Sequence, residues 1–189
     1  MKHHPVIILA AAVALAGATI GAQKAAPKSA SGAGIVHAHA DIKGEGITGT
    51  ADFTESQQGT GKLVTINITV SGLKEGMHGV HLHAVGKCTP DFAAAGGHFD
   101  PGPFGNPDPD ANHPFHMGDI PQLQAAPTGR AVARIATTRV TLSDGPLSLF
   151  DEDGSAIIIH GNPDQWITGA ARSGVSGGPR IACGVIEKR

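Results

Sequence analysis

Hydrophobic and polar residues alternate in several short stretches of the chain. The clearest stretch is 63–70, in which four apolar side chains occupy every second position: Val64, Ile66, Ile68 and Val70. Because successive side chains of a β-strand point to opposite faces of a sheet, this stretch predicts a strand with one buried face. Similar runs rich in Val, Ile and Thr predict further strands at 47–53, 80–85, 130–136, 156–160 and 181–187.

The segments between these runs favour turns and loops. Ser-Asp-Gly-Pro at 143–146 and Glu-Asp-Gly at 152–154 are typical of tight connections between antiparallel strands. No stretch has apolar residues at helical spacing between capping residues. We therefore predict an all-β sandwich or barrel, with two long loops, 86–118 and 161–179, of the length that usually carries function.

The first 22 residues have the three parts of a secretory signal peptide. Lys2 is followed by an apolar run at 6–18 and by small residues at 20–22, where cleavage is expected. The run is too short for a transmembrane span. We expect a signal peptide at 1–22, a flexible leader at 23–34, a folded domain at 35–189, and a periplasmic or secreted protein.

Composition excludes one large class of function. The 14 Lys and Arg residues face 16 Asp and Glu residues, so the net charge of −2 offers no positive field for nucleic acid. With one Trp, six Phe and no Tyr, the core must be packed by aliphatic side chains. At 189 residues, one domain is expected.

The two cysteines, Cys88 and Cys183, favour a disulfide. In an oxidising compartment a cysteine pair is usually bonded, and neither residue has the spacing of a cysteine metal site.

Eleven histidines are too many for this length without an explanation. His81 and His83 alternate in a predicted strand and therefore share a face, although this pair alone is equally consistent with a solvated surface. His98, His113, His116 and Asp119 lie in or next to the first long loop, and His160 ends a strand. Such a set, rich in imidazole nitrogen, suits copper or zinc.

Five motifs, in order, resemble those of copper/zinc superoxide dismutases. They are Gly-Val-His-Leu-His at 79–83, Gly-His-Phe-Asp-Pro at 97–101, His-Met-Gly-Asp at 116–119, Ile-His at 159–160, and Gly-Pro-Arg-Ile-Ala-Cys-Gly-Val-Ile at 178–186. The resemblance covers about 35–189. It implies a Greek-key β-sandwich or barrel of the immunoglobulin-like kind, and an oxidoreductase that converts superoxide to oxygen and hydrogen peroxide.

The resemblance also implies roles for individual residues. Copper would be held by His81, His83, His98 and His160, and zinc by His98, His116 and Asp119, with His98 bridging the two metals. Arg180 matches the arginine that guides superoxide, and His98 would also deliver a proton. Asp164 matches the carboxylate that links ligands of the two metals, and Cys88 and Cys183 match the family's disulfide.

One position departs from the family pattern. The family has another zinc histidine soon after the bridging one, but 99–112 contains no histidine. His113 is the available replacement, because four-coordinate zinc needs a fourth ligand. The alternative is an incomplete zinc site, with copper alone.

The other histidines have simpler interpretations. His78 is at an odd offset from His81, so we expect a structural or exposed side chain. His37 and His39 lie at alternating positions of a further expected strand, the first of the domain, and we expect an exposed polar strand face there. The alternative is a metal site near the surface.

Two other functions compete with the dismutase. A non-catalytic copper-buffering module would keep the histidines but would not need Arg180 or Asp164. A zinc hydrolase would need a general base, and no Glu lies within five residues of a candidate metal histidine in the sequence. For the dismutase we expect superoxide as the small-molecule partner, no nucleic acid, no transmembrane span, and a homodimer as the candidate assembly.

Overall fold

The alternating pattern forms ten β-strands in the computed structural model, which describes residues 34–102 and 108–189. The predicted signal peptide and the predicted leader before Gly34 lie outside the described residues. No helix in the described ranges is long and apolar enough to cross a membrane. The strands are β1 (Val36–Gly44), β2 (Ile47–Gln58), β3 (Gly61–Ser71), β4 (Gly76–His78), β5 (Val80–His83), β6 (Leu123–Ala125), β7 (Ala131–Thr137), β8 (Ala156–His160), β9 (Arg180–Val185) and β10 (Glu187–Lys188).

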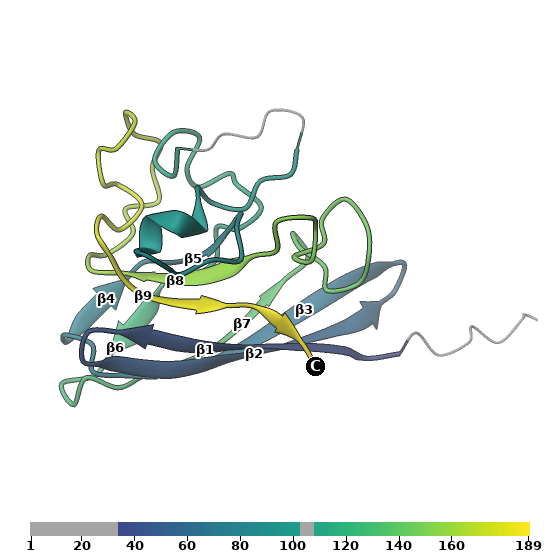
Figure 1. Cartoon of the computed structure of the whole chain (residues 1–189), viewed down its shortest axis with the longest axis horizontal. Coiled ribbons are helices and arrows are strands. Elements are labelled where there is room, and N and C mark those ends of the chain that lie inside the picture. Colours follow the sequence, from purple (N-terminus) through teal and green to yellow (C-terminus); the bar gives the residue numbers. More distant parts are fainter. Residues whose placement is uncertain (1–33, 103–107) are drawn as a thin grey trace, which may run out of the picture. The chain divides into compact units, whose positions relative to one another are not determined.

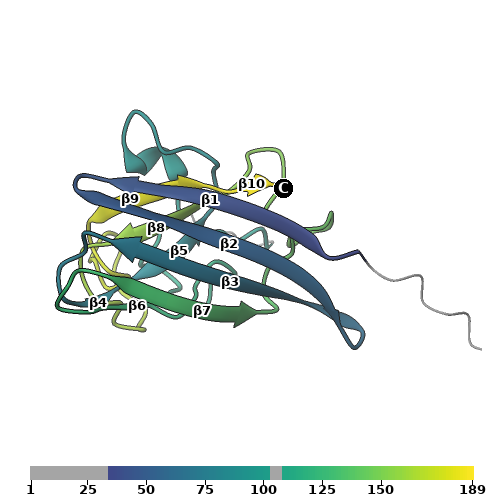
Figure 2. The same cartoon turned by 90° about the horizontal axis from the view of Figure 1, so that it is seen from below.

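The strands form one antiparallel sheet that curls into a nearly closed barrel. Their order is β4-β6-β7-β3-β2-β1-β9-β8-β5, and β10 also pairs with β1. β9 pairs with β1 although β2 to β8 lie between them in the sequence, so the sheet is not a simple succession of hairpins. In Figures 1 and 2, β1, β2, β3 and β7 form one layer, and β5 and β8 lie on its other side. The predicted fold class is confirmed.

The core follows directly from the alternation. Val64, Ile66, Ile68 and Val70 are at most 1% exposed, and the facing positions of β2 and β7 supply Phe53 and Ile135. From the opposite layer, Val80, Leu82, Ile157 and Ile159 pack against them. Each fully buried aliphatic side chain of this kind contributes about 1.5–3 kcal/mol to the free energy of unfolding. Aliphatic packing therefore closes the barrel with few aromatic rings.

Both predicted long loops lie on the outer side of β5 and β8 (Figure 1). The first contains one short 3₁₀ helix, η1 (Phe92–Ala95), which begins with a hydrogen bond from Ala93 N to the Asp91 carboxylate. The second has no strand or helix between β8 and β9. With little regular pairing of their own, these loops are held by backbone hydrogen bonds outside the strands and by side-chain contacts.

The disulfide expected from the sequence is confirmed. Cys88, which precedes η1, is bonded to Cys183 of β9, and their Cα atoms are 5.8 Å apart. The bridge attaches the first long loop to the barrel wall and closes a segment of 95 residues.

Candidate metal centre

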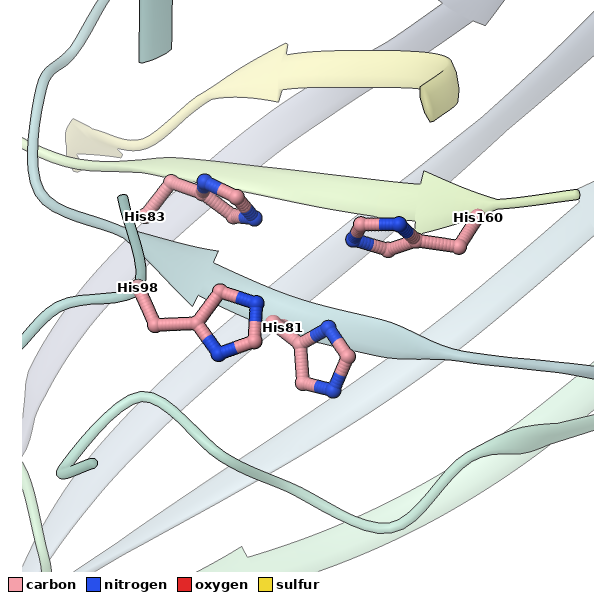
Figure 3. A group of neighbouring side chains, drawn as sticks. All are labelled: His81, His83, His98 and His160. Atoms are coloured by element: carbon pink, nitrogen blue, oxygen red, sulfur yellow. The ribbon is translucent and has the colours of Figure 1, made fainter. Parts of the chain in front are cut away.

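Four buried histidines from three parts of the chain point into one space (Figure 3). His81 and His83 project from the same face of β5, as the strand alternation predicts, and His160 ends the neighbouring strand β8. His98 comes from the first long loop, which forms a bridge to His83. All four side chains are at most 2% exposed. One nitrogen from each lies within 4.8 Å of the others.

Hydrogen bonds orient three of these rings. Nδ1 of His83 donates to Gly96 O at 3.0 Å, and Nδ1 of His160 donates to Gly178 O at 3.0 Å. Nε2 of His81 donates to the Asp164 carboxylate at 2.9 Å. A ring nitrogen that donates leaves its counterpart unprotonated in neutral imidazole. His83 Nε2, His160 Nε2 and His81 Nδ1 are therefore free lone pairs that face one another.

Those lone pairs have no protein partner. In the described part of the chain, His81 Nδ1, His83 Nε2, His98 Nε2 and His160 Nε2 are all buried without a hydrogen bond. Leaving one buried polar atom unpaired costs about 1–3 kcal/mol, so four together need a common explanation. The donor set fits a metal that accepts imidazole nitrogen, such as copper.

Burial keeps these imidazoles neutral. Desolvation, followed by the repulsion of His98, lowers the pKa of His81 to about 4. Desolvation likewise lowers the pKa of His98 to about 4 and that of His160 to about 3. The pKa of His83 is also lowered well below its usual range, mainly by burial. The rings are thus ready to bind a cation at neutral pH without first losing a proton.

A second group of ligand atoms surrounds the Asp119 carboxylate. Nδ1 of His98 lies 2.6 Å from Oδ1, Nδ1 of His113 lies 3.2 Å from Oδ1, and Nδ1 of His116 lies 3.1 Å from Oδ2. All four residues are buried. Three imidazoles and one carboxylate make a donor set suited to zinc. Ligand atoms of His81, His98, His113 and Asp119 lie within 4.8 Å of one another, and His116 contacts this group through Asp119.

Asp164 connects the two groups of histidines. Its Oδ2 accepts from His81 Nε2 at 2.9 Å, and its Oδ1 accepts from His113 Nε2 at 2.7 Å. Burial opposes the charge of Asp164, but the hydrogen bonds from His113 and His81 outweigh it and lower its pKa. For His113 the two carboxylates outweigh burial in the same way and raise its pKa. The raised pKa means that protons compete with a cation for His113 more strongly than for the four rings whose pKa is lowered.

The guanidinium of Arg180 is fixed beside the four-histidine group. It donates from Nη1 to Phe92 O at 2.7 Å and from Nη2 to Gly96 O at 2.6 Å. The same carbonyl of Gly96 accepts from His83, so Arg180 is tied to a ring of the group. Arg180 and His160 line a pocket of about 210 Å³. This pocket offers a small anion a fixed positive charge next to the imidazoles.

His78 supports the centre without being a candidate ligand. It is 3% exposed, and its ring nitrogens each lie 2.8 Å from a carbonyl oxygen, one of His160 and one of Lys74. His78 thus holds the end of β8 in place, a structural role that agrees with the sequence interpretation.

Two residues that join the long loops, Asp110 and Ser176, were not identified from the sequence, because isolated loop residues carry no periodic signal.

The remaining histidines lie away from the centre. His37 is exposed on the outer face of β1, and His39 lies between Asp52, at 2.7 Å, and Asp41, at 3.2 Å. They form part of a polar strand face.

Most of the chain is similar to proteins of one known family. The family model described as copper/zinc superoxide dismutase matches residues 47–186. A protein of Deinococcus radiodurans named Superoxide dismutase [Cu-Zn] is 40% identical over 152 residues, which is 75% of this chain and 78% of that one. Its namesake from Caulobacter vibrioides is 39% identical over 149 residues, 74% of this chain and 78% of the relative.

Solved structures agree on the fold. The crystal structure of a double mutant of a SOD-like protein from Bacillus subtilis matches with a TM-score of 0.62 and 31% identity, over 77% of this chain and 94% of that chain. The clock protein EA4 matches with a TM-score of 0.66 and 26% identity, over 80% and 93%. Together with the family model and the relatives, the match establishes that this chain belongs to the copper/zinc superoxide dismutase family.

Proposed function

We propose that the protein disproportionates superoxide, converting two superoxide anions and two protons into oxygen and hydrogen peroxide. The observation that carries the proposal is the fixed Arg180 guanidinium beside four buried imidazoles whose inward nitrogens have no partner. Copper, when bound, supplies the one-electron chemistry of both half-reactions. A copper-buffering module has no need for an anchored cation at the mouth of its site.

We assign copper to the inward nitrogens of His81, His83, His98 and His160. The assignment is supported by the burial of the four rings and by the distance of at most 4.8 Å between their ligand nitrogens. It is also supported by the hydrogen bonds that the other nitrogen of each ring makes. Zinc is assigned to His98, His113, His116 and Asp119, supported by the convergence of three Nδ1 atoms on one carboxylate. The hydrogen bond from His113 to Asp164 supports His113 as the fourth zinc ligand.

In this mechanism the chain's own residues bind the anion and move a proton. Arg180 attracts superoxide and orients it by hydrogen bonds from its guanidinium. When Nε2 of His98 is not engaged by copper, it would carry a proton and pass it to the reduced product, while Asp119 holds the ring through Nδ1. Asp164 positions His81 and His113 in the tautomers that their assigned roles need. Attraction must be local, because the chain as a whole carries net negative charge.

The deciding experiment measures metal content and superoxide dismutation on the same purified sample. We expect about one copper and one zinc per chain, and fast dismutation that requires the copper. Copper bound without dismutation would favour the buffering module instead. Zinc bound alone, with hydrolytic activity, would favour the hydrolase.

We further propose that the protein is exported to the periplasm or secreted. Support comes from the three-part sequence pattern at 1–22 and from the disulfide, which persists in oxidising compartments. Sequencing the amino terminus of the mature protein from cell fractions tests this, with a start near residue 23 expected.

A homodimer is the proposed assembly. Support comes from exposed apolar side chains on the two long loops, with Phe115 65%, Ile167 50% and Trp166 40% exposed. Sedimentation of the metal-loaded protein tests it, and a monomer at all concentrations would contradict it.

A further inference from the structure

The buried carboxylate of Asp110 joins the two long loops. Its side chain is 2% exposed and lies three residues before His113. Oδ2 accepts from Gly174 N at 2.7 Å, and Oδ1 accepts from Ser176 N at 3.0 Å and from Ser176 Oγ at 2.7 Å. All three donors belong to the second long loop. One carboxylate therefore accepts hydrogen bonds from two backbone N–H groups of a turn that lies outside the strands.

The hydrogen bonds keep this carboxylate charged. Burial raises the pKa of Asp110, but the donors of Gly174 and Ser176 outweigh burial and lower it. Hydrogen bonds to an ionised group are roughly twice as strong as those between neutral groups. Asp110 is in neither group of potential metal-ligand atoms, so its charge serves the loop contact.

On one side, Asp110 lies in the segment that carries His113. Its carbonyl accepts from Gly169 N at 3.0 Å, and the carbonyl of His113 accepts from Thr168 Oγ1 at 2.6 Å. Between them, Asn112 adopts the left-handed backbone conformation, with φ of 64°. The second loop therefore grips this turn at both ends and aims His113 toward Asp119 and Asp164.

On the other side, Asp110 holds the wall of the pocket that His160 and Arg180 line. Asp110, Gly174 and Ser176 all line that pocket. Gly177, the residue after Ser176, packs so closely that a Cβ would lie 2.7 Å from His160 Cβ, and its φ is 110°. The turn held by Asp110 thus lies against the end of β8.

We propose that Asp110 is a positioning residue that couples the zinc ligand His113 to the wall of the anion pocket at His160 and Arg180. The proposal rests on the proposed dismutase function for the role of the pocket. It also explains how a zinc histidine at a shifted position in the sequence is held in place. Asp110 supplies the attachment that the shifted position requires.

The test compares Asp110→Asn with the wild-type protein, both loaded with copper and zinc. The substitution keeps the size of the side chain but removes its charge. It also replaces one of the two acceptor oxygens, which face Gly174 and Ser176, with an amide that donates. Zinc transfer to a fluorescent chelator should become about 10- to 100-fold faster, the effect of one or two lost charge-assisted hydrogen bonds. Asp144→Asn, at a side chain 97% exposed, is the matched control and should leave the rate unchanged.

The second measurement reads the pocket without relying on turnover. Azide, a small anion that binds Cu(II), is titrated while the copper spectrum is recorded. In Asp110→Asn the azide dissociation constant should shift several-fold, and it should not shift in the control. Faster zinc release with unchanged azide binding would limit Asp110 to holding His113 and overturn the coupling.

Ser176→Ala keeps the proposal testable if Asp110→Asn does not fold. It removes one of the three donors, so it should change zinc release and azide binding in the same direction by a smaller factor. Unchanged zinc release in both variants overturns the proposal. If the wild type binds both metals without dismutation, the proposed function fails, whereas the effects on zinc and azide still decide the coupling.

Discussion

The Asp164 carboxylate accepts a hydrogen bond from His113 at 2.7 Å and another from His81 at 2.9 Å. His113 is 51 residues and His81 is 83 residues from Asp164 in the sequence. Because both rings donate from Nε2, both direct Nδ1 toward the interior of the centre. One carboxylate thus determines which nitrogen is offered by one ring of each proposed metal site.

Asp164→Asn should weaken the binding of at least one of the two metals. An amide offers one acceptor oxygen, so only one of the two rings, His81 of the copper group or His113 of the zinc group, keeps its hydrogen bond. Loss of such a partner typically costs 10- to 100-fold in metal affinity. Competition with a chelator of known affinity, for each metal separately, measures the change. Equal affinities in variant and wild type would remove Asp164 from the positioning role.

His113→Ala should abolish stable zinc binding and leave copper bound. Removal of one of four proposed ligands opens the zinc site, whereas none of the proposed copper ligands is changed. Metal analysis should find about one copper and less than a tenth of the wild-type zinc. His37→Ala, on the exposed face of β1, is the matched control. Retention of full zinc content in His113→Ala would mean that the site is completed without His113.

Arg180→Ala should slow dismutation at least tenfold and weaken its dependence on ionic strength. The guanidinium attracts the anion through an electrostatic field that salt screens, so both effects have one cause. Copper content should persist, because Arg180 donates to the backbone carbonyls of Phe92 and Gly96 and is not itself one of the proposed copper ligands. Arg134→Ala, at an exposed position of β7, is the control. Unchanged rates in Arg180→Ala would contradict the guiding role.

Removal of the disulfide should destabilise the fold. The double variant Cys88→Ala, Cys183→Ala frees a 95-residue segment in the unfolded chain, and a closed loop of that length contributes about 4–5 kcal/mol on the chain-entropy model. Denaturant unfolding of the metal-free proteins, one oxidised and one variant, gives the difference in the free energy of unfolding. A difference below about 1 kcal/mol would show that the bridge contributes little to stability.

Ionised Glu55 should stabilise the folded protein at neutral pH, and this stabilisation should be lost in acid. Its buried carboxylate accepts from Leu142 N, Ser143 N and Ser143 Oγ, at 2.6, 3.1 and 2.6 Å, and thereby anchors the loop after β7. Burial alone would raise the pKa of Glu55, but these hydrogen bonds and the charge of Lys62 lower it below the ordinary 4.5. The stabilisation is therefore present above pH 4.5 and is lost as pH falls through the lower, folded-state pKa.

Glu55→Gln tests this pH dependence. At neutral pH the variant should unfold with a free energy about 2 kcal/mol lower than the wild type. The difference should shrink as pH falls below 4.5. Denaturant unfolding of the metal-free proteins across pH 3 to 7 measures it. A difference independent of pH would assign the effect to lost packing rather than to the charge.

Much of the fold was predictable because strand alternation is a local property. The strands at 63–70 and 156–160 differ little from β3 and β8, and the two long loops lie where turn-forming residues replaced the pattern. The short strands β4 and β6 and the terminal β10 were not predicted. Three residues or fewer carry too little periodicity to distinguish a strand from a loop.

The positions of the candidate histidine ligands were also predictable in part. The His81 and His83 pair could be placed on one strand face from spacing alone, and the five motifs indicated the other ligands through the family resemblance. His113 could be named as the available replacement, but its orientation could not, because residues 99–112 have no regular backbone pattern.

The sequence by itself therefore determined the strand faces, the aliphatic core, the pairing of the two cysteines and the kind of chemistry that the histidines suit. The resemblance indicated that Asp164 links ligands of the two metals. Only the tertiary structure decided which nitrogen of each ring faces inward, which two rings Asp164 joins, and that Asp110 attaches one long loop to the other. Alternation is written in neighbouring residues, whereas these contacts join groups 51 to 83 residues apart. Contacts of that kind follow from how the closed barrel brings its loops together, which local pattern does not encode.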